Sequence, residues 1–589
     1  MSNQEIAGLL KNIAAAYSIK DDKKFRFQII AYQKAADTIA HLNTEIVEFY
    51  KNNTLDTIPG VGASIKSHLE ELMKTGRVKR FEWVLKDIPE AVFPLLDIPS
   101  FGPKKAYALV KHFNLKDKAT VIDDLEKLAK EGKIASLAGF GQKSQADILR
   151  AIQEFREGKG KTTRMVLPYA QEVADRLVEY LKKSEYVERV EPLGSLRRKV
   201  ATVGDIDLAV ASNNPKAVLD YFVSYPYLER VIEKGDVSGS ILVAGGRQVD
   251  LLIQPPEAFG SLLQHFTGSK NHNVHLRELA LKKGLSLSEY GIKFLKEKKQ
   301  PVKKYKTEEE FYKTIGLDYI EPEMREDTGE IELAAAHKLP TLVQLKDLKG
   351  DLHIHSDYPI EPSHDLGLSP MQEMLDKAKD LGYEYLGFSE HNPSISKHTS
   401  KQIYEILKKR DVKIEQLKSS NKSVRIIKLL EVDILPSGEL AIDDKSLNLL
   451  DGAIVSIHSV FSMDIEKMTQ RVLKGLSHPK AKILAHPTGR LLNTRPGYEL
   501  DWKKIFEFAK KHNKALEINS WPTRLDLPDS IIRNAVEAGV KMVIDTDSHR
   551  VNQMEMARYG VAIAKRGWAK KSDILNTLGY NDFSNWLKS

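Results

Sequence analysis

The spacing of hydrophobic positions divides the chain into regions of different predicted structure. From about residue 3 to residue 159, apolar residues recur at intervals of three and four, which predicts successive amphipathic helices. Three β-branched runs follow, at 189–192, 206–211 and 249–253, and they alternate with helical stretches. From residue 350 onward, strand and helix patterns alternate regularly, as in an α/β layer or barrel.

These changes of pattern predict six segments in a multidomain protein of α+β and α/β class. A chain of 589 residues is too long for one hydrophobic core, so several domains are expected. The segments are helical domains at 1–88 and 89–160, a sheet-containing domain at 161–256, a mixed domain at 257–325, a connector at 326–348 and an α/β domain at 349–589.

Composition excludes several classes of protein. Hydrophobic residues make up 42% and charged residues 29%, as in a folded globular chain. No run approaches the roughly 20 apolar residues of a membrane helix, and the first residues do not resemble a signal peptide. We therefore expect a cytoplasmic protein with no membrane partner. The net charge of +8, from 89 basic and 81 acidic residues, is too small to indicate a nucleic-acid partner by itself.

The absence of cysteine restricts the chemistry further. It excludes disulfides, thiolate catalysis and zinc held by cysteine. Any metal site must use His, Asp and Glu, a donor set that suits Mg²⁺, Mn²⁺ or a histidine-rich Zn²⁺ centre.

Three glycine-containing segments in the helical region share one form, because each ends one predicted helix and starts the next. Glycine permits a tight hairpin whose backbone N–H groups face outward at a helix N-terminus, which suits a phosphate. A single copy fits an ordinary glycine-terminated helix equally well, whereas three copies favour binding to the DNA backbone. The segments are Ile58-Pro59-Gly60-Val61-Gly62, Ile98-Pro99-Ser100-Phe101-Gly102 and Leu137-Ala138-Gly139-Phe140-Gly141, and the expected contacts are Gly60, Gly62, Gly102, Lys104, Gly139 and Gly141.

Two aspartates on one predicted strand form the strongest motif of the first half. Asp205 and Asp207 are two positions apart, so their side chains point to the same face. Two close carboxylates repel each other unless a cation lies between them, which is how Mg²⁺ is held for phosphoryl transfer. Asp250, on a later predicted strand, is the expected third carboxylate. An Asp-x-Asp alone occurs often by chance, and its surroundings make it specific.

Those surroundings are Gly194-Ser195-Leu196-Arg197-Arg198 before the two aspartates. Gly194 and Ser195 offer an unobstructed backbone and a hydroxyl to triphosphate oxygens. Arg198 offers positive charge where pyrophosphate leaves. The combination indicates a nucleotidyltransferase palm.

The order of these motifs, followed by His265-Phe266-Thr267-Gly268-Ser269-Lys270 and Asn273, resembles DNA polymerase beta and its family X relatives over residues up to about 325. The resemblance implies that Asp205, Asp207 and Asp250 hold Mg²⁺ or Mn²⁺ for catalysis. The three glycine-containing segments resemble the helix-hairpin-helix motif, which implies K⁺ or Na⁺ at the hairpins. The residues implied in nucleotide binding are Arg164, Gly194, Ser195, Arg198, Gly204, His265, Phe266, Gly268 and Asn273.

Two positions depart from the polymerase beta pattern. His265 stands where polymerase beta has tyrosine, so the motif does not predict how strongly ribonucleotides are rejected. His68 stands where the lysine of the beta-type lyase would lie, and histidine cannot form that imine. We therefore predict no beta-type lyase activity.

Histidines dominate the chemistry of the second half, where ten of the 17 lie in residues 350–589. A lone histidine is more often structural than a ligand, but here His and acidic residues follow successive apolar runs. Ligands at the C-terminal ends of strands are what a metal site in a barrel requires. The runs end in His353-Ile354-His355, Glu390-His391, Glu431-Val432-Asp433, His458, His486 and Asp547-Ser548-His549.

This second pattern resembles the PHP domain, a distorted (β/α)₇ barrel with a trinuclear metal centre. The resemblance implies a Mn²⁺ or Zn²⁺ cluster that hydrolyses phosphate esters. For the acidic ligand after the first two histidines we favour Asp365 over Asp357. The implied ligands are His353, His355, Asp365, His391, Glu431, His458, His486, Asp547 and His549.

We therefore predict a family X DNA polymerase that fills short gaps in repair, with 3′–5′ exonuclease or phosphoesterase activity in the PHP domain. Its expected partners are gapped or primed duplex DNA and dNTPs, and a nucleoid-associated monomer is expected. One alternative is a DNA-end-binding protein whose main activity is that of the PHP nuclease or phosphatase. Another is a small-molecule phosphatase, which would hydrolyse a simple phosphate ester without degrading DNA.

Overall fold

The computed structural model describes residues 3–40, 46–51, 53–58, 60–98, 101–137, 140–156, 164–243, 247–297, 299 and 301–589. Its contacts separate two compact units. The first contains residues 1–163 with 243–247, and the second contains residues 164–242 with 248–589. Each unit is described by itself below.

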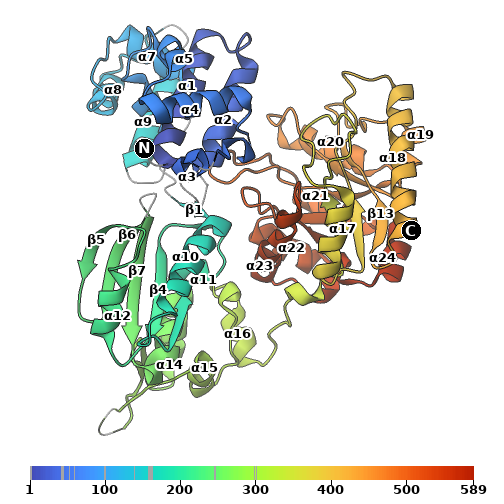
Figure 1. The fold of residues 1–589 in the computed structure, drawn as a ribbon. Coiled ribbons are helices and arrows are strands. Elements are labelled where there is room, and N and C mark those ends of the chain that lie inside the picture. Colours follow the sequence, from blue (N-terminus) through green and yellow to red (C-terminus); the bar gives the residue numbers. More distant parts are fainter. Residues whose placement is uncertain are drawn as a thin grey trace. The chain divides into compact units, whose positions relative to one another are not determined.

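The first unit is helical, in agreement with its three-to-four residue period (Figure 1). It has two hydrophobic cores, one formed by buried residues between Ile6 and Val84 and the other by buried residues between Ala91 and Ile152. The helices are α1 (Asn3–Asp21), α2 (Arg26–Ala40), α3 (Ile46–Lys51), α4 (Ala63–Thr75), α5 (Lys79–Leu85), α6 (Val92–Leu95), α7 (Pro103–His112), α8 (Val121–Lys130) and α9 (Gln142–Arg156).

The second unit begins with a five-stranded sheet of order β2-β4-β7-β6-β5. β4 runs parallel to β7 and antiparallel to β2, so the two carboxylate-bearing strands are direct neighbours. The strands are β1 (Met165–Val166), β2 (Arg189–Pro192), β3 (Thr202–Val203), β4 (Ile206–Ala211), β5 (Leu228–Lys234), β6 (Ser238–Val243) and β7 (Arg247–Gln254), and the helices are α10 (Leu167–Leu181), α11 (Gly194–Arg197) and α12 (Pro215–Phe222).

A smaller subdomain follows, with the three-stranded sheet β10-β9-β8. Its elements are α13 (Phe259–Thr267), α14 (Lys270–Lys282), β8 (Leu285–Ser288), β9 (Gly291–Phe294), β10 (Val302–Lys303) and α15 (Glu308–Ile315). The segment expected to be a plain connector instead forms α16 (Glu330–Ala335), and its Ile331, Ala334 and Leu342 are buried in the core of this subdomain. The apolar residues of α16 recur at helical spacing and are buried against α14 and α15, which stabilises the helix. Glu330 and Glu332 in its first turn also favour the helix N-terminus.

The last region consists of parallel strands surrounded by helices (Figure 1). Its strands are largely buried on both faces, which explains why they read as continuous apolar runs. The strands are β11 (Gly350–Ile354), β12 (Tyr385–Phe388), β13 (Arg425–Lys428), β14 (Glu431–Asp433), β15 (Ala453–Ser456), β16 (Ala481–Leu484), β17 (Ala515–Asn519) and β18 (Lys541–Asp545). The helices are α17 (Met371–Asp380), α18 (Ser400–Ser420), α19 (Asp444–Leu447), α20 (Ile465–Leu476), α21 (Trp502–Lys511), α22 (Asp529–Ala538), α23 (Ala557–Arg566) and α24 (Tyr580–Lys588).

These strands form two sheets, β11-β12-β13 and β14-β15-β16-β17-β18. β13 and β14 are one strand broken at Leu429-Leu430, where its neighbour changes from β12 to β15. Isolated parallel bridges join the sheets at both edges, between Ile354 and Ser548 and between His391 and Glu431. Counting β13 and β14 together gives seven strands, each followed by a helix from α17 to α23. The region is a distorted (β/α)₇ arrangement.

The barrel region and the subdomain before it share a core. Trp568, just after α23, is 4% exposed and packs in the cluster of Leu276, Phe311 and Leu342. The carbonyl of Ala569 accepts a hydrogen bond from Val343 N. Among the described helices, none combines the length and apolar composition that crossing a bilayer requires.

Candidate active sites

The three palm aspartates meet at one edge of the sheet. Asp207 and Asp250 are directly paired across β4 and β7, and Asp205 lies one residue before β4 rather than inside it. An oxygen of each carboxylate lies within 4.8 Å of the others. Such a group of acidic oxygens is the donor set that Mg²⁺ or Mn²⁺ prefers.

Electrostatics in this group favour a bound cation. Burial, and then repulsion from Asp205 and Asp250, raises the pKa of Asp207 from its ordinary value to about 7. Ser240 Oγ donates to Asp250 Oδ1, and Gln248 Nε2 lies 3.1 Å from both Asp250 oxygens. Both donors orient Asp250 toward the group without neutralising it.

The predicted triphosphate residues surround this edge. Gly194 has φ +55° and begins α11, and a Cβ there would lie 2.8 Å from Asp207 Oδ2, so only glycine fits. Ser195 lies in the first turn of α11. Arg164 donates from Nε to Thr202 Oγ1 (2.9 Å) and from Nη2 to Thr202 O (2.6 Å), which places its guanidinium 3.4 Å from the Cβ position of Gly204.

The residues expected around the sugar and base lie on α13 and at its end. Asn273 Nδ2 donates to the carbonyl of His265 (2.7 Å) and its Oδ1 accepts from Gln264 (3.0 Å), so the amide joins α14 to α13. Burial lowers the pKa of His265. Phe266 is partly buried beside it, with ring centroids 4.8 Å apart. A Cβ on Gly268 would lie 3.0 Å from Arg198 Nη1, so a side chain there would crowd Arg198.

Sequence reasoning missed a buried ion network behind this pocket. Arg197 Nη2 lies 2.5 Å from one oxygen of Glu308, and Arg325 Nη1 lies 2.6 Å from the other. Arg197 also donates to Thr267 Oγ1 (2.5 Å). Glu308 and Arg325 are nearly inaccessible to solvent, so the charge of each is stabilised by the other. The adjacent arginines Arg197 and Arg198 could have indicated this network from sequence, because a buried arginine needs an acidic partner.

The three hairpins have the same turn where the structure describes them. Val61 N donates to Ile58 O, Phe101 N to Ile98 O and Phe140 N to Leu137 O. Gly62, Gly102 and Gly141 each precede a helix, namely α4, α7 and α9. Gly60 has φ +82°, which favours glycine. The remaining predicted contact, Gly139, lies outside the described residues.

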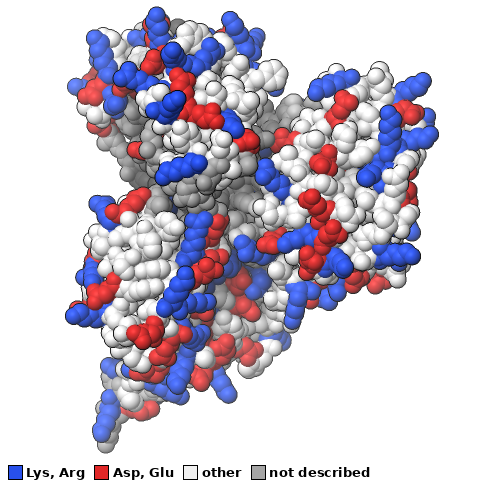
Figure 2. Space-filling view, viewed as in Figure 1, with Lys and Arg blue, Asp and Glu red and all other residues white. Residues whose placement is uncertain are grey.

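Lys104, one of the expected DNA contacts, has an acidic partner in the structure. Lys104 is paired with Asp22 at 2.7 Å, and on the face shown in Figure 2 basic side chains are interspersed with acidic ones. Backbone N–H groups at the three helix starts are therefore the better candidates for phosphate contact.

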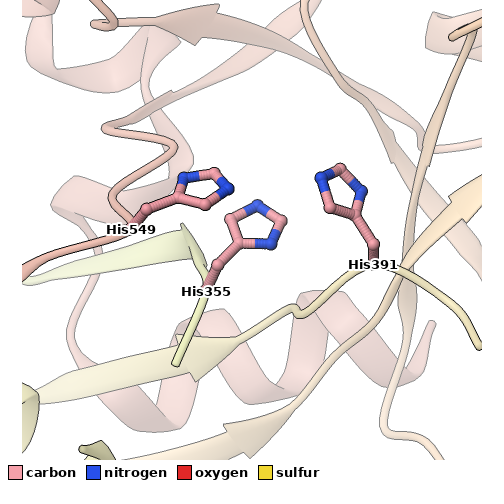
Figure 3. Close-up of side chains that lie close together, drawn as sticks. All are labelled: His355, His391 and His549. Carbon is pink, nitrogen blue, oxygen red and sulfur yellow. The ribbon is translucent and has the colours of Figure 1, made fainter. Parts of the chain in front are cut away.

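Several histidines of the region 350–589 come together at the C-terminal ends of the strands. Figure 3 shows His355, His391 and His549, which follow β11, β12 and β18, gathered around one space. Each of these residues offers one nitrogen within 4.8 Å of the other two. Two further groups with the same spacing are His353-His355-Glu431 and His391-Glu431-His458.

Glu431 is the centre of the cluster. Its Oε2 lies 3.1 Å from His353 Nε2 and 2.9 Å from His391 Nδ1, and its Oε1 lies 2.9 Å from His486 Nε2. Burial, and then the neighbouring His549 and His391, lower the pKa of His355 well below its usual value, so this imidazole is neutral. A neutral imidazole beside an ionised carboxylate is the protonation state that metal binding requires.

The cluster passes a test of fit for metal ions. Several buried polar atoms have no hydrogen-bond partner in the described structure, although buried nitrogen and oxygen atoms are normally paired. They belong to His353, His355, His391, Glu431, His486 and His549. All of these residues except His486 also belong to the candidate metal groups, so divalent cations bound there would satisfy atoms that the protein leaves unsatisfied.

One candidate group contains a histidine that sequence reasoning passed over. His364 Nε2 lies 3.1 Å from Asp433 Oδ1, and His458 Nδ1 lies 2.7 Å from the same oxygen. These three residues form a fourth candidate group. Asp365, exposed like His364, belongs to none of the four groups in this region, which also leave out His486 and Asp547. Asp433 lies two positions after Glu431 on β14, and that spacing could have identified it.

Other polar residues orient the cluster or line it. Glu517 Oε1 accepts from His353 Nδ1 at 2.6 Å, as a partner that fixes a metal-binding histidine does. Arg524 Nε lies 3.5 Å from Asp547 Oδ2, so a positive side chain faces the ligands. Such a cation beside a metal cluster is stabilised by an anion such as a phosphate.

Comparison with known proteins places both sites in one class. Family models for the helix-hairpin-helix domain, the DNA polymerase beta thumb and the PHP domain match residues 1–78, 262–326 and 351–521. Together with the palm carboxylates, they define a beta-type polymerase joined to a PHP domain. The chain is 33% identical to the DNA polymerase/3′-5′ exonuclease PolX of Bacillus subtilis over 590 residues, the whole of both chains. It belongs to the bacterial family X DNA polymerases with a PHP domain.

Two further relatives match the two halves separately. DNA polymerase lambda of Rattus norvegicus is 24% identical over 353 residues, which are 55% of this chain and 56% of that protein. A protein of Thermoanaerobacter named as a probable phosphatase is 27% identical over 237 residues, or 38% of this chain and 89% of that protein.

Proposed function

We propose that this chain fills short gaps in DNA during repair and trims 3′ ends with its PHP domain. It is a DNA-directed DNA polymerase with a metal-dependent 3′–5′ exonuclease, as its relationship to PolX over the full length indicates. The observation that supports two activities in one chain is the presence of two separate metal-binding arrangements. One is the acidic group at Asp205, Asp207 and Asp250, and the other is the histidine cluster around Glu431.

At the palm, we assign divalent-cation binding to the three aspartates, with Mg²⁺ or Mn²⁺ as the ion. When bound, such ions neutralise charge on the reacting phosphates. Arg198 and Arg164 then contact the triphosphate, while Gly194 and Gly204 leave room for its approach. Positioning and charge stabilisation account for most of the rate enhancement in this reaction class. Phe266, Gly268 and Asn273 are assigned to the sugar and base, with His265 beside them.

In the PHP domain, we assign a Mn²⁺ or Zn²⁺ cluster, which when bound activates water and polarises a phosphate ester. Arg524 is placed to hold the anionic substrate, and Glu517 and Asp433 keep His353 and His458 oriented. The proposed ligands are His353, His355, His364, His391, Glu431, His458, His486, Asp547 and His549. Asp365, the sequence-based choice, is replaced in this proposal by His364.

The remaining parts of the proposal concern partners and organisation. The helix-hairpin-helix segments bind the backbone of gapped or primed duplex DNA, with K⁺ or Na⁺ at the hairpins, and the chain acts as a monomer at the nucleoid. The six segments 1–88, 89–160, 161–256, 257–325, 326–348 and 349–589 remain our proposed domains, with the fifth packed on the fourth.

One gel tests the function. A gapped duplex labelled at the 5′ end of its primer is incubated with and without dNTPs in Mn²⁺. Wild-type protein should extend the primer when dNTPs are present and shorten it when they are absent. Combined Asp205→Ala and Asp207→Ala should abolish extension and spare shortening, and His353→Ala should do the reverse. Loss of both activities in either variant would overturn the assignment of one activity to each site.

A further inference from the structure

A side chain of the PHP domain reaches the triphosphate arginine of the palm. Arg566, the last residue of α23, donates from Nη1 to the main-chain carbonyl of Arg198 at 2.8 Å. The same Nη1 lies 2.8 Å from Glu326 Oε1. The side chain of Arg566 is only 6% exposed, so these contacts are made in a site from which water is largely excluded.

Arg566 is held in place from within its own domain. Its Nε and Nη2 lie 2.8 Å and 2.6 Å from Asp529 Oδ2, at the start of α22. A guanidinium whose far edge is fixed by a carboxylate presents its remaining nitrogen in one direction. That nitrogen is the one that contacts the palm.

Glu326 is shared between two arginines. Arg198 Nε lies 3.0 Å from Glu326 Oε1, the oxygen that also accepts from Arg566. Arg198 Nη1 donates to Thr267 O at 2.5 Å, and no described residue accepts from Arg198 Nη2. Arg198 Nη2, which has no acceptor among the described residues, is therefore available to a phosphate oxygen.

A second contact of the same kind lies nearby. Asn493, in the loop between β16 and α21, donates from Nδ2 to the main-chain carbonyl of Arg164 at 2.8 Å. Side chains of the PHP domain thus hold the backbones of both arginines to which we assign the triphosphate.

We propose that Arg566 is a positioning residue for nucleotide binding by the polymerase, a role that rests on the proposed assignment of Arg198 to the triphosphate. Arg566 fixes the main chain of Arg198 and takes part of the charge of Glu326. Without it, Glu326 pairs with Arg198 alone and competes with the triphosphate for the guanidinium. The PHP domain thereby sets the affinity of the polymerase for dNTPs without contacting the nucleotide.

The test measures KM and kcat for one dNTP on a one-nucleotide gap, using the full chain. Arg566→Met should raise KM about 10-fold, the effect of losing a hydrogen bond to a charged group, and change kcat less than about 3-fold. Arg566→Lys keeps the cation and should give an intermediate KM. Arg558→Met is the matched control, because Arg558 lies on the same helix, is exposed, and contacts Tyr559 rather than Arg198 or Glu326.

A second substitution separates positioning from general damage. Adding Glu326→Gln to Arg566→Met removes the competing carboxylate and should lower KM again, which a misfolded palm would not do. The inference is overturned if Arg566→Met leaves KM within about 2-fold of wild type, if Arg558→Met raises KM equally, if kcat falls while KM stays, or if Glu326→Gln brings no recovery. Absence of extension by the wild-type chain would instead overturn the proposed function itself.

Discussion

Asp207 and Asp250 lie directly opposite each other on the neighbouring parallel strands β4 and β7. Side chains at paired positions of a sheet share a face, so the backbone register alone brings the two carboxylates together. The register thus assembles two of the three carboxylates, and Asp205 joins them from the residue before β4. The palm is therefore organised for a cation by the sheet itself.

This register predicts the effect of Asp250→Asn. An amide keeps the shape of the side chain and accepts from Ser240, but it removes one of three negative charges. Primer extension in a single turnover should fall by at least about 100-fold, because charge stabilisation is the main catalytic contribution. Exonuclease activity on the same DNA should stay unchanged, and retained extension would show that Asp250 is not part of the site.

The raised pKa of Asp207, about 7, predicts how metal binding at the palm depends on pH. The ionised carboxylate binds the cation, so protonation competes with the metal below this pKa. Apparent affinity for Mn²⁺ should fall about tenfold per pH unit below about pH 7 and level off above it. The measurement is a Mn²⁺ titration from about pH 5.5 to 8.

A chain with combined Asp205→Ala and Asp207→Ala provides the baseline for that titration, since it keeps the PHP cluster and lacks the palm site. Subtracting its binding isolates the palm contribution. A palm affinity that does not change with pH would contradict the raised pKa.

His364 and Asp365 provide a matched pair for testing the PHP ligands. His364 belongs to a group with Asp433 and His458, and Asp365 belongs to none of the groups in this region. We expect His364→Ala to lower bound metal per chain and to reduce exonuclease activity by about 10-fold or more, as loss of a ligand or its partner does. Asp365→Ala should keep both within about 2-fold. The reverse result, measured by elemental analysis of the purified variants, would restore Asp365 as the ligand.

The burial of Trp568 predicts that the thumb and the PHP domain stabilise each other. Its ring is 4% exposed in the thumb core, and the Arg533 guanidinium lies 3.5 Å from the ring centroid. Trp568→Ala should lower the free energy of unfolding by about 3–5 kcal/mol, the usual cost of removing a buried aromatic side chain. Chemical denaturation followed by circular dichroism provides the measurement. Trp83→Ala, at a residue 46% exposed, is the control, and an equal loss there would argue against the shared core.

Motifs with a short period were predictable from sequence. The alternation at Asp205 and Asp207, the two histidines at 353 and 355, and the recurring glycines at 62, 102 and 141 each express a local geometry. A strand or hairpin fixes where such side chains point before any tertiary contact forms. The matches to thumb, hairpin and PHP family models confirm the class of protein that these motifs indicated.

The features that sequence did not predict are contacts between residues far apart in the chain and residues in irregular loops. The contact between Arg198 and Arg566 joins residues that no local pattern relates. His364 lies in a segment between β11 and α17 without regular secondary structure, so no periodicity separated it from Asp365. The segment 326–348 was expected to be a connector between two domains. The apolar residues Ile331 and Ala334 of this segment are buried in the core of the subdomain that precedes it.

The burial of Trp568 in the thumb also bears on how this enzyme evolves. Deleting residues 349–589 would remove Trp568 from this hydrophobic cluster and expose the residues packed against it. Loss of the nuclease during evolution should therefore proceed by substitution of the histidines, with the fold of residues 349–589 retained. We expect relatives that have lost the nuclease to keep the fold of residues 349–589 and to lack the histidines proposed as ligands.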